Sequence, residues 1–145
     1  TTGGPIVRDN ELWFYYRGMR NDGPKSAYES STGIAVLRRD GFASLNADED
    51  GGLVITRPFI FEGEGKLYVN AEVSAGGSVR AAAVDEDTAE ELGGFAEQDS
   101  VAVTGDSTRA LLRWRERGSL GRFEGRYVRL AFHLKSAKLF SFWIE

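Results

Sequence analysis

Residues 127–135, YVRLAFHLK, alternate between apolar and polar side chains with a period of two. Successive side chains of a β-strand point to opposite faces, so this pattern predicts a strand with one buried face. Residues 66–73 alternate in the same way. Strands of this kind bury their apolar face against a second layer. The residues expected to face this core are Leu67, Val69, Ala71, Val73, Val128, Leu130, Phe132 and Leu134.

Short strand-like runs bounded by Gly, Asp or Ser continue along the whole chain. The pattern predicts an all-β fold, a two-layer antiparallel β-sandwich of the jelly-roll or concanavalin-like kind that begins at about residue 40. Trp114 shares a strand face with Leu112 and is expected in the core. The run ELWFYYR, residues 11–17, is apolar on both sides and predicts a strand covered on both faces.

One segment, DTAEELGG at 87–94, has the signals of a helical turn. Asp87 would be its N-cap, Glu90 would complete a capping box and Gly93 would end the turn.

Composition excludes several classes of function. The chain has no cysteine, which excludes disulfides, thiolate metal sites and a cysteine nucleophile. No apolar run approaches the roughly 20 residues of a membrane span, so no membrane partner is expected. No leader sequence is visible, and the sequence does not identify the cellular compartment. Residues 40–106 carry 15 acidic and 3 basic side chains, and residues 109–145 carry 3 acidic and 9 basic. The arginines of the basic part are spread singly and form no cluster. We therefore expect the basic C-terminal part to neutralise the acidic middle part within one fold, and we expect no nucleic-acid binding.

Two features of the sequence are candidates for a functional site, one catalytic and one calcium-binding, and each can also be explained by a structural role. His133 is the only histidine; it lies mid-strand without a nucleophile motif, which favours a surface or interface role over catalysis. NADEDG at 46–51 places Asn46, Asp48 and Asp50 as in the first half of a calcium loop. The twelfth position of that loop should be glutamate but is Arg57. The motif is therefore a weak calcium candidate, and an acidic turn is favoured.

Several stretches together resemble the C-terminal β-sandwich of proteins similar to glycoside hydrolase family 32, the invertase, levanase and inulinase group. They are IAVLRRDGFASL, GGLVITRPFIF, KLYVNAEV, VDEDTAEELGGF, TGDSTRALLRW and the closing VRLAFHLKSAKLFSFWIE. In such proteins a five-bladed propeller precedes the sandwich. The resemblance implies a sandwich domain at 33–145, preceded at 1–32 by a segment that contains the last propeller strand and a linker.

The resemblance implies a non-catalytic accessory module that stabilises a catalytic propeller and contacts glycan. The family's catalytic residues lie in the propeller, and none can be placed on this chain. Glycan contacts are expected on the polar strand faces, at Tyr68, Asn70, Arg80 and His133. The alternative function is an independent carbohydrate-binding module. Residues 11–17 are expected to fold back onto the sandwich or to pair with a second copy, forming a homodimer.

Overall fold

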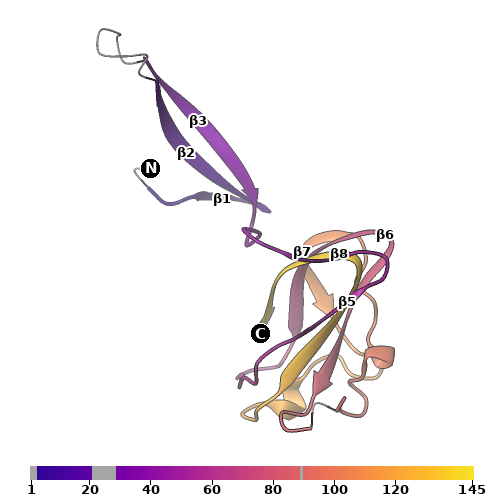
Figure 1. Ribbon diagram of the computed structural model, residues 1–145. Coiled ribbons are helices and arrows are strands. Elements are labelled where there is room, and N and C mark those ends of the chain that lie inside the picture. Colours follow the sequence, from indigo (N-terminus) through magenta and orange to yellow (C-terminus); the bar gives the residue numbers. More distant parts are fainter. Residues whose placement is uncertain (1–2, 21–28, 89) are drawn as a thin grey trace. The chain divides into compact units, whose positions relative to one another are not determined.

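The computed structural model describes residues 3–20, 29–88 and 90–145. Its described part is almost entirely β-structure and forms two compact units, Thr1–Phe42 and Ala43–Glu145 (Figure 1). The first unit holds β1 (Ile6–Arg8), β2 (Glu11–Arg20) and β3 (Glu29–Arg38). The second holds β4 (Leu45–Ala47), β5 (Gly52–Ile55), β6 (Leu67–Val84), β7 (Asp106–Leu112) and β8 (Arg129–Ile144), with 3₁₀ turns η1 (Glu97–Asp99) and η2 (Gly121–Phe123).

The second unit is an antiparallel sandwich built around the long pair β6 and β8. The strands run in the order β4-β8-β6-β7, and β5 also pairs with β8. The first half of β6 pairs with the second half of β8, from Leu67 opposite Ile144 to Val73 opposite Ala137. Their other halves pair from Ser78 to Val84. Each long strand thus contributes to both layers, and the expected two-layer sandwich is confirmed.

Both long strands bend at the same level. The register of the pair shifts between Val73 and Ser78, and Ser136 on the facing strand has a φ of 43°. A Cβ at Gly77 would collide with the backbone carbonyls of Lys135 and Ser136, so the bend needs glycine there. The bend brings together two rings of one strand: Phe132 and Phe142 lie 5.0 Å apart between ring centroids. In a straight strand, positions ten residues apart would be separated by about 33 Å.

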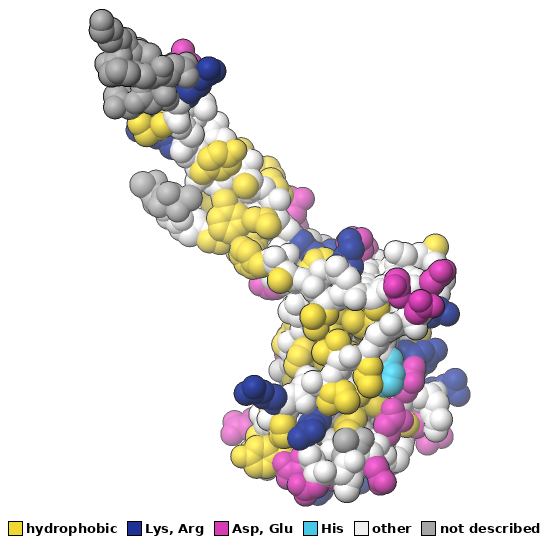
Figure 2. All heavy atoms as spheres, in the orientation of Figure 1, with side chains coloured by type: hydrophobic (Ala, Val, Ile, Leu, Met, Phe, Trp, Pro, Cys, Tyr) yellow, Lys and Arg dark blue, Asp and Glu magenta, His cyan; other side chains and the backbone are white. Residues whose placement is uncertain are grey.

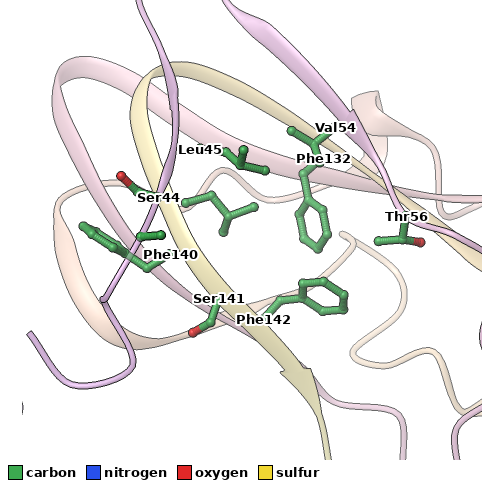
Figure 3. A pocket seen from close by; sticks show the side chains of 10 residues that line it. Ser44, Leu45, Val54, Thr56, Phe132, Phe140, Ser141 and Phe142 are labelled. Carbon is green, nitrogen blue, oxygen red and sulfur yellow. The ribbon is translucent and has the colours of Figure 1, made fainter.

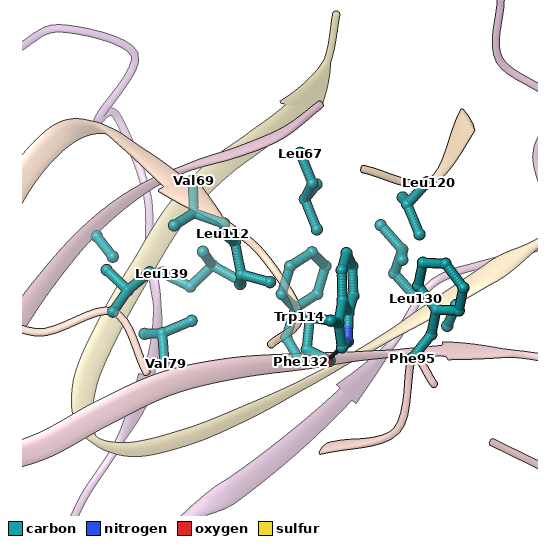
Figure 4. Close-up of a cluster of buried hydrophobic side chains, with 14 of the residues drawn as sticks. Leu67, Val69, Val79, Phe95, Leu112, Trp114, Leu120, Leu130, Phe132 and Leu139 are labelled. Carbon is teal, nitrogen blue, oxygen red and sulfur yellow. Dashed lines mark hydrogen bonds between the residues drawn. The ribbon is translucent and has the colours of Figure 1, made fainter. Parts of the chain in front are cut away.

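The core between the layers contains the residues that alternation predicted. All eight predicted core residues are at most 8% exposed. Seven lie in β6 or β8, and the eighth, Val128, directly precedes β8. Trp114 is 1% exposed, and its indole N–H donates to the carbonyl of Ala81 at 2.9 Å (Figure 4). Because a buried indole needs a hydrogen-bond acceptor, this bond ties the segment after β7 to the opposite layer. The ring of Phe95 packs edge-on against Trp114, with 5.2 Å between centroids.

The expected helical turn at 87–94 is wrong for the described residues of that segment. Asp85, two residues before the predicted cap, accepts hydrogen bonds from the backbone amides of Asp87 and Thr88 and from the Thr88 hydroxyl. These hydrogen bonds lower the pKa of Asp85, and the bond from the Thr88 amide contributes most. The chain then returns to the sheet, where Leu92 N–H donates to the carbonyl of Ala83. Aspartate here closes a turn in place of capping a helix.

The first unit is a three-stranded antiparallel meander with β2 in the centre. β2 pairs with β3 along its whole length, from Glu11 opposite Arg38 to Arg20 opposite Glu29, and with β1 at its start. The expectation of a strand covered on both faces is not met: Leu12 is 6% exposed, but Tyr15 and Tyr16 are each 48% exposed. The ring of Tyr16 lies over Gly33, its partner in the register, where a Cβ would collide with it.

The division between the units differs from the expected boundary at residue 33. In the described ranges 3–20, 29–88 and 90–145, β3 pairs with β2 and with no other strand, and residues 33–42 belong to the unit of the meander. The amide of Arg39 donates to the carbonyl of Asn10, which extends this pairing beyond the strand end. Sequence alternation could not assign β3, because a strand pattern does not say which partner the strand will pair with.

Truncating Phe132 to alanine should lower the free energy of unfolding by about 3–5 kcal/mol, because the ring is 1% exposed and its removal leaves a cavity. Urea denaturation measures this loss. Tyr127→Ala is the matched control on the same segment, where the ring is 59% exposed, and should change stability by less than about 0.5 kcal/mol. A Phe132→Ala loss below about 1 kcal/mol would contradict the assigned core.

Candidate functional site

The four residues predicted for glycan contact fall into two places on β6 and β8. Tyr68 lies opposite Trp143 in the first layer, and Asn70 lies opposite Ser141 nearby. Arg80 lies opposite His133 in the second layer, beyond the bend. The structure therefore does not bring the four together into one site.

Asn70 is not available to a ligand. Its side chain is 1% exposed, although it lies on the strand face that sequence alternation marked as polar. The register of β6 shifts beside Asn70 on both sides, against β7 and against β8. Bulges of this kind turn a side chain away from its regular direction. Asn70 is therefore a buried residue at the two bulges, and its role is structural.

Arg80 and His133 are held by groups of their own chain. The guanidinium of Arg80 donates to the carbonyl of Ser100. The imidazole of His133 lies between two carboxylates, with Nδ1 3.2 Å from Glu97 Oε2 and Nε2 3.7 Å from Glu91 Oε1 (Figure 2, cyan). Because the carboxylates approach opposite ring nitrogens, they cannot both bind one metal ion together with the histidine. The arrangement is an interaction between a strand and the segment that covers it.

Tyr68 belongs to a row of aromatic and charged side chains on the outer face of the first layer. Its ring stacks on Trp143, with 5.6 Å between centroids and 16° between planes. The guanidinium of Arg109 lies 4.5 Å from the centroid of the Tyr68 ring. Glu145 joins the ends of the row: one carboxylate oxygen accepts from Arg109 at 2.7 Å and the other from the indole of Trp143 at 3.0 Å. We call these four residues the aromatic row.

The row combines partial exposure with a fixed geometry. The side chains of Arg109 and Glu145 are 56% and 46% exposed, and both rings are partly exposed. The hydrogen bond to Tyr68, followed by the charge of Glu145, raises the pKa of Arg109. The row therefore keeps one cation and one carboxylate beside two stacked rings. Sequence reasoning selected only Tyr68, because the pairing of Tyr68 with Trp143 depends on the register of distant strands.

The acidic motif at 46–51 forms a turn between β4 and β5. The Asp48 carboxylate accepts from the amide of Asp50 at 3.1 Å, and its carbonyl accepts from Gly51, whose φ is 86°. The side chain of Asn46 accepts from the hydroxyl of Ser44 at 2.7 Å. Residues 46–51 thus form a turn that is closed by hydrogen bonds within the segment. Among residues 3–20, 29–88 and 90–145, no three His, Asp or Glu side chains gather closely enough to hold a metal ion.

An apolar groove opens beside β8, between β4 and β5. It has a volume of about 410 Å³, and the rings of Phe132 and Phe142 form part of its wall (Figure 3). Leu45 and Val54 contribute from the two short strands. No charged side chain lines it, so the groove offers shape and apolar contact but no acid, base or nucleophile for catalysis.

Comparisons with protein families, with curated proteins and with solved structures found no match to this chain. In the part of the chain that the structure describes, no helix is long and apolar enough to cross a membrane. The resemblance to family 32 sandwiches thus stays a prediction from sequence motifs, and so does the propeller origin of β2.

Millimolar calcium chloride should leave the melting temperature unchanged, because the Asp48 carboxylate closes its own turn and Arg57 occupies the position of the bidentate ligand. A ligand that binds the folded state would raise this temperature. Differential scanning fluorimetry with calcium, and with magnesium as the ionic-strength control, measures the effect. A rise specific to calcium that Asp50→Asn abolishes would show that the turn binds the ion.

Proposed function

We propose that this chain is a non-catalytic accessory β-sandwich module of a glycoside-hydrolase-like protein of the family 32 kind. In this role it stabilises a catalytic β-propeller domain and contacts glycan. The proposal starts from the sequence resemblance. The observation that carries it further is an apolar face of the meander that its own unit leaves uncovered.

This open face is defined by strand register. Residues directly opposite one another in an antiparallel sheet share a face, and so do alternate residues of one strand. Ile6 opposes Trp13, Val36 opposes Trp13 from the other side, and Ile34 opposes Tyr15. Four of these side chains, Ile6, Tyr15, Ile34 and Val36, are at least 47% exposed, and Trp13 is partly exposed. Met19 lies on the same face of β2 and is 62% exposed. We call this side of the meander the open face; its apolar side chains are Ile6, Trp13, Tyr15, Met19, Ile34 and Val36, and Arg17 lies on it between Tyr15 and Met19.

Such a face favours a partner that is itself a sheet. Burial of apolar surface contributes about 25 cal/mol per Å² removed from water, and exposed apolar patches on a folded protein mark contact sites. Propeller blades are small antiparallel sheets that pack face to face around a channel. A three-stranded meander with an apolar face suits a position beside such a blade. The sandwich that follows in the chain would then be anchored by the meander.

The carboxylates at the two candidate places of the sandwich already have partners of their own chain. Retaining enzymes place two carboxyl groups about 5–5.5 Å apart across the scissile bond. The carboxylates nearest the aromatic row and His133 are engaged by Arg109, Trp143 and His133 itself. The groove beside β8 has no charged lining. These features support an accessory role.

A second candidate function is an independent carbohydrate-binding module. The aromatic row favours it, because stacked rings beside hydrogen-bonding groups suit the apolar faces and hydroxyls of sugars. The two candidates differ in what the meander does. An accessory module needs a covering domain on the open face, whereas an independent module does not.

The open reading frame that encodes this chain tests the accessory role. We expect it to encode a β-propeller domain, and removal of this chain from that protein should lower the melting temperature of the propeller. In the joined protein, Tyr15→Arg should have the same effect, because it places a charge on the open face; Ser31→Arg, on the opposite face of the meander, is the control. A reading frame without a propeller, or an unchanged melting temperature, would contradict the proposal.

Without a propeller, a second copy should cover the open face, so the isolated chain is expected to sediment as a dimer through residues 11–17 and their neighbours. Two such faces would bury apolar side chains against one another. Tyr15→Arg and Ile34→Arg should shift the chain to a monomer, whereas Ser31→Arg should not. Analytical ultracentrifugation measures the mass. A chain that is monomeric at every concentration would exclude this dimer.

The purified chain should not hydrolyse sucrose, inulin or levan, since glycoside hydrolysis needs two positioned carboxyl groups. Reducing-sugar release after prolonged incubation measures the activity. Trace hydrolase from the expression host is controlled with a preparation of the Trp143→Ala variant made in the same way. Turnover that a single Asp or Glu substitution abolishes would show that the chain is an enzyme.

A further inference from the structure

We infer that the aromatic row of Arg109, Tyr68, Trp143 and Glu145 is the surface that binds a neutral sugar unit of a glycan, with the indole of Trp143 as its stacking platform. This inference rests on the glycan contact in the proposed function and assigns that contact to particular residues. Of the four, only Tyr68 was selected from sequence.

Strand order places Trp143 at the open end of the row. Arg109 belongs to β7, Tyr68 to β6 and Trp143 to β8, and these strands are neighbours in the order β7-β6-β8. Arg109 and Trp143 therefore approach Tyr68 from opposite flanks. Beyond β8, β4 pairs only with residues 137–139 and β5 only with residues 131–134. Among the described residues, no strand pairs with Trp143 on its far flank, so a further ring can continue the stack there.

The polar groups of the row suit sugar hydroxyls. Each oxygen of Glu145 accepts one hydrogen bond from the row, from Arg109 or from the indole, and each keeps a second lone pair. A hydroxyl at the edge of Trp143 can donate to that carboxylate. The guanidinium of Arg109 has five N–H donors, and its side chain is 56% exposed. Carboxylate and guanidinium thus provide both an acceptor and a donor beside the ring.

Charge balance favours a neutral ligand. Arg109 is paired with Glu145, and Lys66, on the same side of β6 as Tyr68, is paired with Glu64. An acidic sugar would meet the carboxylate of Glu145, and a cationic ligand would meet Arg109. A nucleic acid would require an excess of positive charge that these two pairs cancel. A neutral sugar uses the ring and both polar groups without breaking an ion pair.

Affinity electrophoresis of the full chain in gels that contain inulin, levan, mixed-linkage β-glucan or galactomannan tests the inference. We expect retardation in at least one gel. Trp143→Ala should weaken the apparent affinity about tenfold or more, because it removes the stacking ring. Trp143→Phe should restore most of it and Glu145→Gln should weaken it. Tyr127→Ala, which removes a 59% exposed ring of the sandwich outside the row, should leave it unchanged. Thermal unfolding of each variant confirms that it is folded.

The outcomes separate this inference from the proposed function. Retardation that Trp143→Ala leaves intact would overturn the inference while glycan contact at another surface stands. Equal loss in Tyr127→Ala and Trp143→Ala would also overturn it, because the stacked row would then have no special role. No retardation in any gel would overturn the inference, and the stabilisation of a propeller would still be decided by its own melting experiment. If Trp143→Ala unfolds, Trp143→Phe and Glu145→Gln carry the test.

Discussion

The shared bend of β6 and β8 is the feature on which the rest of the sandwich depends. Each strand passes from one layer to the other, so the layers are joined by continuous backbone as well as by side-chain packing. The contact between Phe132 and Phe142 exists only because β8 returns over itself. The glycine at 77 permits the close approach of the two backbones at this level. The core, the groove and the ends of the outer face all follow from this geometry.

The bend also separates two chemically different surfaces. Beyond the bend, the outer face around Ala82, Val84 and Ala131 is buried. The amide of Leu92 donates to the carbonyl of Ala83 beside it. His133 lies at the margin of this covered area and meets two carboxylates from the covering segment. Before the bend, the outer face carries the partly exposed aromatic row. Small side chains thus mark the covered surface, and large aromatic ones mark the surface open to a ligand.

The meander presents a different physical situation. Its central strand, β2, pairs with β3 along its whole length and with β1 at its start. Among the described residues, the outer edge of β3 faces no further strand, so the meander leaves both a strand edge and an apolar face uncovered. A partner that covers the open face gains mainly from the removal of apolar surface from water, and requires little rearrangement of the backbone. This property is one that the accessory role we propose requires.

Alternation in the sequence determined the β-class, the buried face of β6 and β8, and the core positions of Phe132 and Trp114, because a period of two follows directly from strand geometry. It did not determine three other features. Asn70 is buried since two bulges meet beside it, and Asp85 replaces Asp87 as the capping aspartate since the chain turns back to the sheet. The pairing of Tyr68 with Trp143 joins residues that are far apart in sequence. Register and bending are set by long-range packing, so only the tertiary structure decided which polar-face residues form a candidate site.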